Sequence, residues 1–321
     1  MAILTDRAWP DDTIERKILE DAGITVIAAG AGPNPVEEID RLVSDTQPDA
    51  ILTCWDRISD VAISSAKNLR VITRLGIGLD NIAVSTATSH GVVVTNVPDY
   101  CTEEVSDHAV ALALAWTRGV AHADREIRAG RWNPSRFQLR RLSTLTCGII
   151  GFGKIGRRTA AKLLGFGAEV LIHSRTPPVG ASSVTNVTMN ELLSSSDIVF
   201  LHVPLTDATQ HLISADELRI MRPGAVLINV SRGGLVDTAA LLESLNAGHL
   251  GGACLDVLEG EPIVPAELLA HDSVIITPHI AFTSDVALSE LRRGAAEEVV
   301  RVLAGKPAEH PCNSPTPRSN T

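Results

Sequence analysis

Short aliphatic segments alternate with amphipathic segments along almost the whole chain, and this alternation restricts the possible folds more than any other feature. Runs of Val, Ile, Leu and Ala are typical of strands buried on both faces, and the amphipathic segments between them are typical of helices. Two such series occur, one on each side of a long Ala- and Leu-rich segment. Because strands that alternate with helices pair in parallel, the sequence predicts two Rossmann-like, doubly wound α/β domains with parallel sheets and a cleft between them.

The first series occupies residues 1–100. Aromatic residues make up only 3% of the chain, so aliphatic side chains must form most of its core. The predicted strands are Ala2–Thr5, Ile24–Ala28, Ala50–Thr53, Val71–Thr73 and Val92–Thr95. The predicted helices are Asp12–Asp21, Val36–Ser44, Asp60–Ala66 and Val84–Ser89.

The Ala- and Leu-rich segment predicts one long helix from Thr102 to Gly130. Thr102 is a suitable N-cap, and the acidic residues that follow it suit the first turn of a helix. A helix of this length can bridge two domains or pack against a second subunit. We therefore expect a homodimer with this helix at its interface.

The second series extends from Leu145 to Thr277. Its predicted strands are Thr146–Ile150, Glu169–His173, Asp197–Val203, Ala225–Val230, Ala253–Val257 and Val274–Thr277. Six strands with intervening helices suit a dinucleotide-binding sheet. A final helix, Ser284–Ala304, has no strand to follow, so we expect it to return to the first domain, and we expect Lys306–Thr321 to be a frayed tail. The predicted domains are a substrate-binding domain of residues 1–100 and 287–321 and a dinucleotide-binding domain of residues 101–286.

Composition argues against several classes of protein. The net charge of -10 does not suit a nucleic-acid-binding protein. The five cysteines form no CxxC pair, which argues against a zinc site and favours a reducing compartment. No signal peptide and no apolar segment long enough to span a membrane is recognisable. We expect a cytoplasmic protein without a metal ion, a membrane partner or a nucleic-acid partner.

A glycine-rich loop, Gly151-Phe152-Gly153-Lys154-Ile155-Gly156, follows the first strand of the second series and precedes a predicted helix, Arg157–Leu164. This GxGxxG pattern is weak alone, but a preceding strand and a following helix are the context in which it binds a dinucleotide. The first glycine permits a tight turn, the second lets the backbone approach the diphosphate, and the third lets the helix pack on the strand. An ordinary glycine-rich turn is the alternative.

The next strand ends in His173-Ser174-Arg175-Thr176. Sites for NAD place an acidic residue there to bind the ribose 2′-hydroxyl. A carboxylate would repel a 2′-phosphate, whereas Ser174, Arg175 and Thr176 offer hydroxyl donors and a guanidinium group. The sequence therefore favours NADP(H), with NAD(H) as the alternative if Arg175 is merely an exposed loop residue.

Three polar segments follow the fourth, fifth and sixth strands of the second series: Asn229–Gly234, Asp256–Pro262 and Pro278–Ile280. Doubly wound sheets bind ligands at this edge. An arginine can bind a carboxylate with two hydrogen bonds, and a histidine beside a carboxylate can donate a proton near neutral pH. These residue types suit the reduction of a 2-keto acid.

With these segments the chain resembles the D-2-hydroxyacid dehydrogenase family over nearly its full length. The matching segments are Arg74–Asn81, Asn96–Pro98, Thr102–Val105, the glycine-rich loop, Asn229–Asp237, Asp256–Pro262 and Thr277–His279. The resemblance implies hydride transfer between a nicotinamide cofactor and a small 2-keto/2-hydroxy acid with D stereochemistry. Ser174 stands where the family usually has an NAD-selecting aspartate, and in this the chain resembles NADP-dependent hydroxypyruvate/glyoxylate reductases. We therefore expect a 2-ketoacid reductase.

The resemblance also implies the catalytic residues. Arg232 would bind the carboxylate and carbonyl of the substrate, Glu261 would orient and charge an imidazole, and His279 would be the acid/base. Glu261 rather than Glu259 matches the family motif, in which the glutamate precedes a proline. The backbone amides of Ile77 and Gly78 would bind the substrate carboxylate. The candidates for the substrate side-chain pocket are Cys54, Trp55, Arg57, Arg74, Tyr100 and Trp132.

The same resemblance implies that Asp256 binds the nicotinamide carboxamide, with the backbone groups of Val230 and Ser231 beside it. It also implies that Thr102 lies near the diphosphate. The whole predicted cofactor-binding set is Thr102, Gly151, Phe152, Gly153, Lys154, Ile155, Gly156, Ser174, Arg175, Thr176, Val203, Pro204, Thr209, Val230, Ser231 and Asp256. Two alternatives stay open. The segment Asn96–Val105 is similar to the branch of C-terminal-binding corepressors, which bind NAD(H) and peptides, and an NAD-linked phosphoglycerate dehydrogenase shares the catalytic residues.

Overall fold

The computed structural model describes residues 1–176 and 183–315. Contacts within the chain divide it into two units. Unit 1 comprises Met1–Tyr100 and the C-terminal segment that begins at Ser284, and unit 2 comprises Cys101–Thr283. Each unit has its own parallel sheet, so the predicted fold class is confirmed.

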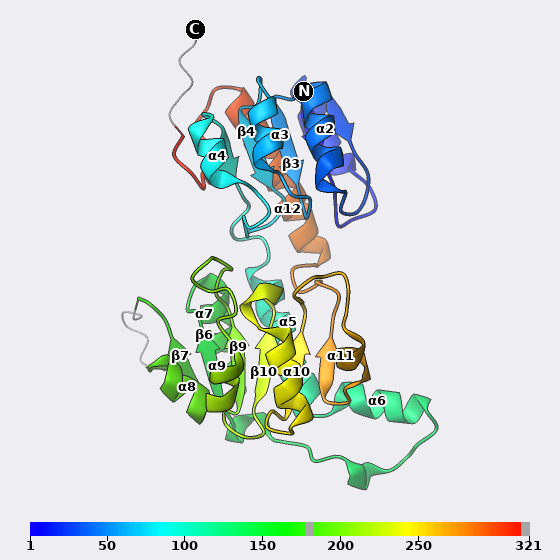
Figure 1. The fold of residues 1–321 in the computed structure, drawn as a ribbon, viewed down its shortest axis with the longest axis vertical. Coiled ribbons are helices and arrows are strands. Elements are labelled where there is room, and N and C mark those ends of the chain that lie inside the picture. Colours follow the sequence, from blue (N-terminus) through cyan, green and yellow to red (C-terminus); the bar gives the residue numbers. More distant parts are fainter. Residues whose placement is uncertain (177–182, 316–321) are drawn as a thin grey trace. The chain divides into compact units, whose positions relative to one another are not determined.

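Unit 1 contains a five-stranded sheet in the order β2-β1-β3-β4-β5, with every pair parallel. Its strands are β1 (Ala2–Leu4), β2 (Val26–Ala28), β3 (Ala50–Thr53), β4 (Val71–Arg74) and β5 (Val93–Thr95). Its helices are α1 (Thr13–Asp21), α2 (Val36–Thr46), α3 (Asp60–Ser65), α4 (Val84–Ser89) and α12 (Asp285–Leu303). Helices α2, α3 and α4 lie on one face of the sheet and α12 on the other, where it packs against β3, β4 and α1 (Figure 1). The strands and helices predicted here are confirmed.

The segment after α12 corrects one prediction. Part of the tail expected to be frayed pairs with the edge strand β5: the backbone N–H of Cys312 donates to the Val94 carbonyl (2.7 Å), and the Val94 N–H donates to Asn313 Oδ1 (2.8 Å). Pro311 forms an antiparallel bridge with Thr95. The exposed polar groups of an edge strand thus gain partners from the chain's own end. Residues 316–321 of the predicted tail lie outside the described residues.

Unit 2 contains a seven-stranded parallel sheet in the order β12-β11-β10-β9-β6-β7-β8. Its strands are β6 (Thr146–Ile150), β7 (Glu169–His173), β8 (Thr185–Asn186), β9 (Ile198–Leu201), β10 (Val226–Asn229), β11 (Gly252–Leu255) and β12 (Val274–Ile276). The six predicted strands are present, and the short strand β8 was not predicted. The strand order reverses at β6, so the loop after β6 lies where doubly wound sheets bind ligands.

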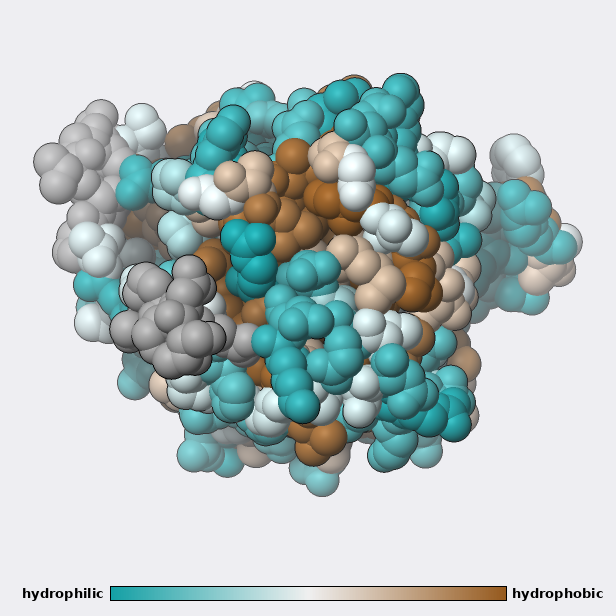
Figure 2. Space-filling model, turned by 90° about the horizontal axis from the view of Figure 1, so that it is seen from above, coloured by the Kyte–Doolittle hydropathy of each residue, from teal (hydrophilic) through white to brown (hydrophobic). Residues whose placement is uncertain are grey.

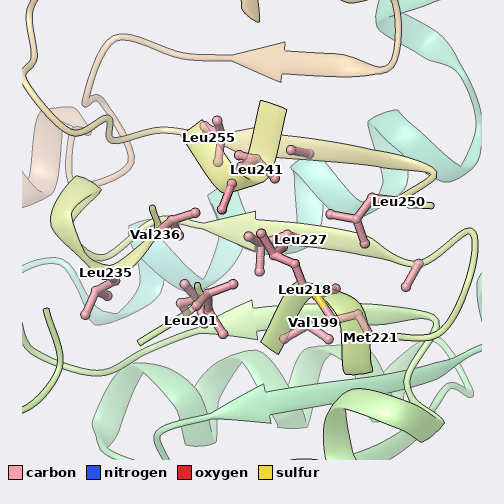
Figure 3. Packing of buried hydrophobic residues seen from close by; sticks show 14 of the residues in the cluster. Val199, Leu201, Leu218, Met221, Leu227, Leu235, Val236, Leu241, Leu250 and Leu255 are labelled. Carbon is pink, nitrogen blue, oxygen red and sulfur yellow. The ribbon is translucent and has the colours of Figure 1, made fainter. Parts of the chain in front are cut away.

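Helices cover both faces of this sheet. They are α5 (Thr102–Thr117), α6 (Val120–Arg128), α7 (Lys154–Gly165), α8 (Met189–Ser195), α9 (Ala215–Ile220), α10 (Thr238–Asn246) and α11 (Ala266–Ala270). Helices α8, α9 and α10 lie in front of the sheet in Figure 1, and α5 packs behind it against β10, β11 and α7. Figure 3 shows the core on the front face, where Leu227 of β10 lies between Leu218 of α9 and Leu241 of α10.

The predicted single helix from Thr102 to Gly130 is wrong, because α5 and α6 are separate helices. Gly119 separates them with a φ of 62°, a left-handed conformation that glycine adopts at little cost. Thr102 is the first residue of α5, and Cys101 rather than Thr102 is its N-cap. Between α6 and β6 lie two short 3₁₀ helices, η1 (Pro134–Arg136) and η2 (Leu142–Thr144).

The surface carries both polar and apolar residues, as expected for a chain with 45% hydrophobic and 21% charged residues. Figure 2 shows one end of the molecule, where polar residues surround a central group of apolar ones. No helix in residues 1–176 or 183–315 is long and apolar enough to span a membrane.

Candidate active site

The three predicted catalytic residues lie in the loops after three neighbouring strands of unit 2. Arg232 follows β10, Glu261 follows β11 and His279 follows β12. These strands are adjacent and parallel, so the loops emerge at the same edge of the sheet. The strand order thus explains how residues far apart in the sequence come together.

His279 and Glu261 form a hydrogen-bonded pair. The Nδ1–H of His279 donates to Glu261 Oε1 (2.7 Å), and the backbone N–H of Leu258 donates to Glu261 Oε2 (3.1 Å). A carboxylate can only accept hydrogen bonds, so Nδ1 carries a hydrogen whether the imidazole is neutral or charged. The nitrogen that can gain or lose a proton is therefore Nε2.

Glu261 is held in its ionised form. Burial alone would raise its pKa, but the hydrogen bond and charge of His279, the Leu258 N–H and the charge of Arg232 together lower the pKa below its ordinary value. The contribution of Arg232 shows that its guanidinium group lies near this carboxylate. Both the histidine and the arginine thus stabilise the ionised form of Glu261.

The backbone around His279 has an unusual conformation. His279 has a φ of 53°, which costs a non-glycine residue on the order of 1–3 kcal/mol and persists only when its surroundings impose it. Its N–H donates to the backbone carbonyl of Asp256 (2.8 Å). The loop after β12 is therefore fixed by the loop after β11, which also carries Glu261.

The carboxylate of Asp256 strengthens this connection. Asp256 Oδ1 accepts from Thr277 Oγ1 (2.6 Å) and from the N–H of Ile280 (3.0 Å), while Oδ2 accepts from the N–H of Ala281 (2.9 Å). The single hydroxyl hydrogen of Thr277 is used in this bond, so His108 Nε2 is the donor in its 2.9 Å hydrogen bond with Thr277 Oγ1. Asp256, predicted to contact the cofactor, thus also organises the residues on both sides of His279.

Arg232 precedes a short 3₁₀ helix, η3 (Gly233–Leu235). The side chain of Asn229 donates to the Arg232 carbonyl (2.8 Å), and Arg232 Nη1 donates to the Ser231 carbonyl (2.8 Å). A Cβ atom on Gly233 would lie 2.0 Å from the carbonyl carbon of Leu258. Only glycine permits the Arg232 loop to approach the backbone of the neighbouring loop this closely.

Glu259 and Glu261 have different partners. Glu259 Oε1 accepts a hydrogen bond from His211 Nε2 (2.7 Å), whereas Glu261 pairs with His279. The geometry is therefore compatible with the choice of Glu261 as the partner of His279.

The glycine-rich loop follows β6 and leads into α7, which begins at Lys154 rather than at the predicted Arg157. A Cβ atom on Gly151 would lie 2.3 Å from the His202 carbonyl, and one on Gly156 would lie 2.2 Å from the Gly151 carbonyl. A Cβ atom on Gly153 would meet nothing within 4 Å. The first and third glycines are thus required by packing, and the second leaves open space beside the backbone.

The remaining predicted cofactor residues lie along the same edge. Ser174, Arg175 and Thr176 follow β7, and the last two are exposed. Within the glycine-rich loop, Phe152 is buried, and the guanidinium carbon of Arg157 lies 5.1 Å from the centroid of the Phe152 ring. Lys154 and Ile155 form the start of α7.

Other members of this set follow β9 and β10. Val203 would contact a Cβ atom on Gly151, and the Pro204 carbonyl accepts from Thr209 Oγ1 (2.8 Å). Val230 is buried, and Ser231 Oγ donates to the Leu201 carbonyl (2.7 Å). Thr102 begins α5 in unit 2.

Ile77 and Gly78 belong to unit 1, where they follow β4. The side chain of Asn96 donates to the Ile77 carbonyl (2.8 Å), which fixes the loop. This bond does not involve the backbone N–H groups of Ile77 and Gly78. Among the other pocket candidates, Arg74 is buried, whereas Trp132 of unit 2 is 84% exposed. Burial raises the pKa of the Cys54 thiol to about 12, so it stays protonated at neutral pH.

The site has no visible metal-binding cluster. Within residues 1–176 and 183–315, no group of three or more His, Cys, Asp or Glu side chains could hold a metal ion. The residues that the sequence did not single out are His108, Thr277 as a side-chain partner of Asp256, and His211. Their contacts join segments that are distant in the sequence, so the sequence alone did not indicate these pairs. Of the three residues, Thr277 alone belongs to a recognised motif.

Comparisons with known proteins agree with this geometry. Residues 110–281 match the family model described as "D-isomer specific 2-hydroxyacid dehydrogenase, NAD binding domain". The chain is 39% identical to a glyoxylate reductase of Pyrococcus furiosus over 289 residues, which cover 86% of this chain and 84% of that one. It is 34% identical to a D-3-phosphoglycerate dehydrogenase of Methanocaldococcus jannaschii over 93% of this chain but only 57% of that one. A solved NADPH-dependent glyoxylate/hydroxypyruvate reductase from Sinorhizobium meliloti, in complex with NADP and malonate, superposes with a TM-score of 0.86 at 31% identity, covering 100% of this chain and 99% of that one.

Proposed function

Because the chain belongs to the D-isomer specific 2-hydroxyacid dehydrogenase family, we propose that it reduces a small 2-keto acid to the D-2-hydroxy acid with NADPH. Membership makes it an oxidoreductase with an NAD-binding domain. The observation that carries the finer proposal is the Glu261–His279 pair beside Arg232 at the edge of the unit 2 sheet.

In this proposal His279 is the acid/base. Its Nδ1–H is committed to Glu261, so the transferable proton lies on Nε2. In the reductive direction the charged imidazole donates this proton to the carbonyl oxygen of the substrate, and the ionised Glu261 stabilises the charged form beforehand. In the oxidative direction the neutral Nε2 accepts the proton from the hydroxyl group.

Arg232 binds and polarises the substrate. Its guanidinium group can donate two parallel hydrogen bonds to the carboxylate and carbonyl oxygens of a 2-keto acid. The backbone amides of Ile77 and Gly78, in unit 1, are proposed to bind the same carboxylate. A cation fixed at the developing alkoxide lowers the barrier more than it would in water.

The chain's own residues fit a dinucleotide cofactor. Gly153 leaves open space beside the backbone at the start of the twelve-residue helix α7, where backbone N–H groups bind phosphate. Lys154 and Ile155 belong to this loop, and Thr102 is proposed to lie near the diphosphate. Val230, Ser231 and Asp256 are proposed to line the nicotinamide end. When bound, the cofactor supplies or accepts the hydride.

A preference for NADP(H) is proposed on the residues that follow β7. Ser174, Arg175 and Thr176 contain no carboxylate to bind a free ribose 2′-hydroxyl, and the exposed Arg175 could bind a 2′-phosphate. The relative from Sinorhizobium meliloti supports this choice, because its structure contains NADP.

The decisive experiment is a panel of 2-keto acids assayed with both NADPH and NADH. Glyoxylate, hydroxypyruvate, phosphonopyruvate and phenylpyruvate differ in size and charge, so they map the side-chain pocket. The relatives support glyoxylate or hydroxypyruvate as substrates. 3-Phosphohydroxypyruvate is added as a fifth substrate. Its turnover alone would favour the phosphoglycerate dehydrogenase alternative, which rests on the 34% identical relative. Peptide binding without turnover would favour a corepressor-like protein.

The assembly and location of the protein belong to the same proposal. Unit 2 exposes apolar side chains in and after α6, which would be covered in a homodimer; they are Val120, Ile127, Trp132 and Leu139. The five cysteines, all within the described residues, form no disulfide bond, as expected for a protein of the reducing cytoplasm.

A further inference from the structure

A second histidine–carboxylate pair lies beside the proposed catalytic loops of unit 2. His211 Nε2 donates to Glu259 Oε1 (2.7 Å), and both side chains are between a third and a half exposed. Glu259 belongs to the loop after β11, two residues before Glu261. His211 belongs to the segment between β9 and α9, which carries no proposed catalytic residue.

The backbone of His211 is tied to the Arg232 loop. Its N–H donates to the Gly234 carbonyl (2.8 Å), and Ile213 pairs with Val236 in a short parallel bridge. His211 has a φ of 49°, a left-handed conformation that the surrounding contacts must impose. The backbone of His211 is therefore bonded to η3, the short helix that begins directly after Arg232.

The side chain of His211 reaches the other catalytic loop. Gly233 packs so closely on that loop that a Cβ atom would lie 2.3 Å from the Glu259 N atom. The His211–Glu259 bond joins the same two loops a second time. The backbone of His211 bonds to Gly234 of the Arg232 loop, and its side chain bonds to Glu259 of the Glu261 loop. The Arg232 loop is thus held between His211 and the loop that carries Glu261.

We propose that His211 and Glu259 form a positioning pair that holds the Arg232 loop against the Glu261 loop, and that affinity for the keto acid depends on the protonation of His211. The proposal rests on the proposed function, since it assigns the substrate carboxylate to Arg232. Neither His211 nor Glu259 touches the substrate. Their effect passes through the position of Arg232.

The charges around His211 support this dependence. The hydrogen bond to Glu259 raises the pKa of His211, burial opposes the shift, and the charges of Glu259 and Asp237 add to it. Both partners are partly exposed, so solvent screens their attraction and the pair adds little to global stability. As the pH rises through this raised pKa, the bond loses the positive charge of the imidazole and becomes weaker, although the neutral Nε2–H still donates to Glu259.

The first test compares His211→Asn, Glu259→Gln and the double variant with the wild-type enzyme. Asparagine tolerates the left-handed backbone of position 211. We expect each single variant to raise KM for the keto acid about tenfold, because small displacements of a substrate-binding group have effects of this size or larger. KM for NADPH should hardly change, and the double variant should match the single ones, since either change breaks the same bond. The matched control is Arg219→Gln, which removes an exposed ion pair with Asp216 in the same unit.

The second test is the pH dependence of KM. The ratio of KM in Glu259→Gln to KM in the wild type should be about ten at pH 6, by the same positioning argument. It should fall as the pH rises through the pKa of His211, because the wild-type bond then loses its charge. Ionisation of His279 affects both enzymes and largely cancels in this ratio. His211→Arg, which keeps the charge at every pH, should bind the keto acid tightly into the alkaline range.

The outcomes separate this proposal from the proposed function. The positioning role is overturned if Glu259→Gln and His211→Asn fold normally and keep the wild-type KM at pH 6. It is also overturned if the ratio of the KM of Glu259→Gln to that of the wild type does not change with pH. In both cases the dehydrogenase assignment stands. If the wild type reduces no keto acid, the proposed function fails first. A variant that loses secondary structure by circular dichroism is set aside, and the Glu259→Gln profile, which leaves the strained backbone of His211 untouched, decides.

Discussion

At the scale of single residues, the proposed chemistry depends on which nitrogen of His279 carries the transferable proton. The hydrogen bond to Glu261 fixes Nδ1 as a donor and leaves Nε2 for the substrate. His279→Ala should therefore lower kcat by about 10²–10⁴-fold, the usual effect of removing an acid/base group, while leaving NADPH binding intact. Steady-state kinetics and a fluorescence titration with NADPH measure the two effects. His249→Ala is a suitable control, because the His249 side chain bonds to the Met221 carbonyl, outside the loops that carry the proposed catalytic residues. A nearly normal rate in His279→Ala would remove this residue from the mechanism.

Glu261 allows a prediction about pH, because its net pKa shift is downward. Burial opposes ionisation, but the bond and charge of His279 outweigh it. A carboxylate with a lowered pKa stabilises the folded state above its ordinary pKa, about 4.3, and loses that contribution as the pH falls through the folded value. The difference in the free energy of unfolding between the wild type and Glu261→Gln should thus be constant near neutral pH and shrink on acidification. Urea unfolding at pH 7, 5 and 4 measures it, and a difference that grew at low pH would contradict the assigned shift.

The cofactor preference is also decided by a few residues. A 2′-phosphate would give Arg175 a charge-assisted hydrogen bond, typically worth about 1.5–3 kcal/mol, which corresponds to a preference of roughly 10–100-fold in kcat/KM for NADPH. Ser174→Asp with Arg175→Ala should reverse the preference, because it removes an attraction and adds a repulsion. Kinetics with both cofactors test this, with Arg219→Gln as a control for the loss of an exposed arginine elsewhere in unit 2. Equal use of NADH and NADPH by the wild type would show that the residues after β7 do not select the cofactor.

How much of the site could be predicted differs between residues. Arg232, Glu261 and His279 stand in short motifs after strands, so sequence alone indicated that they would gather at one edge. The contacts of His108 and His211 depend on residues 169 and 48 positions away in the sequence. No local pattern encodes such pairs, because each side chain looks like an ordinary polar residue within its own segment.

At the scale of helices and strands, local signals predicted existence better than boundaries. The aliphatic runs gave the positions of β1 and β6, because a strand buried on both faces needs uninterrupted apolar residues. The break at Gly119 was missed, because a lone glycine is tolerated in helical sequences and its left-handed φ is set by later contacts. The pairing of Asn313 with β5 was missed because a Pro- and Ser-rich tail carries no strand pattern.

The break between α5 and α6 gives a prediction about stability. Gly119→Ala places a side chain on a residue with a φ of 62°, which costs on the order of 1 kcal/mol, and its Cβ would lie 2.9 Å from Leu139 Cδ2. We expect the free energy of unfolding to fall by about that amount. Gly165→Ala is the matched control, because that glycine ends α7 without a positive φ and with nothing within 4 Å of a Cβ atom. Chemical denaturation should show a loss in the first variant and none in the second; equal effects would mean that the backbone conformation of Gly119 does not matter.

At the scale of the whole molecule, the chain leaves unit 1 after Tyr100 and returns to it at Ser284. The last helix therefore belongs to the unit that the chain builds first, and the described C-terminal segment completes the edge of that unit's sheet. The return was inferable from sequence, because a final amphipathic helix without its own strand must find a face elsewhere. Its partner, the face of β3 and β4 next to α1, was visible only in the structure.

The last prediction concerns assembly. Trp132 is 84% exposed and Ile127 49% exposed, in a segment of unit 2 that carries further exposed apolar side chains. Single exposed apolar residues need no explanation, but we expect several in one segment to be part of a surface that another protein covers. A two-fold homodimer would cover the same segment of both subunits, since an isologous interface uses one surface twice. Sedimentation at micromolar concentration should show a dimer, and Ile127→Glu with Trp132→Glu should shift it toward monomer. Ile263→Glu, which changes a 77% exposed residue outside this segment, should leave the dimer intact. A monomeric wild type, or a dimer unaffected by the double variant, would place the interface elsewhere or remove it.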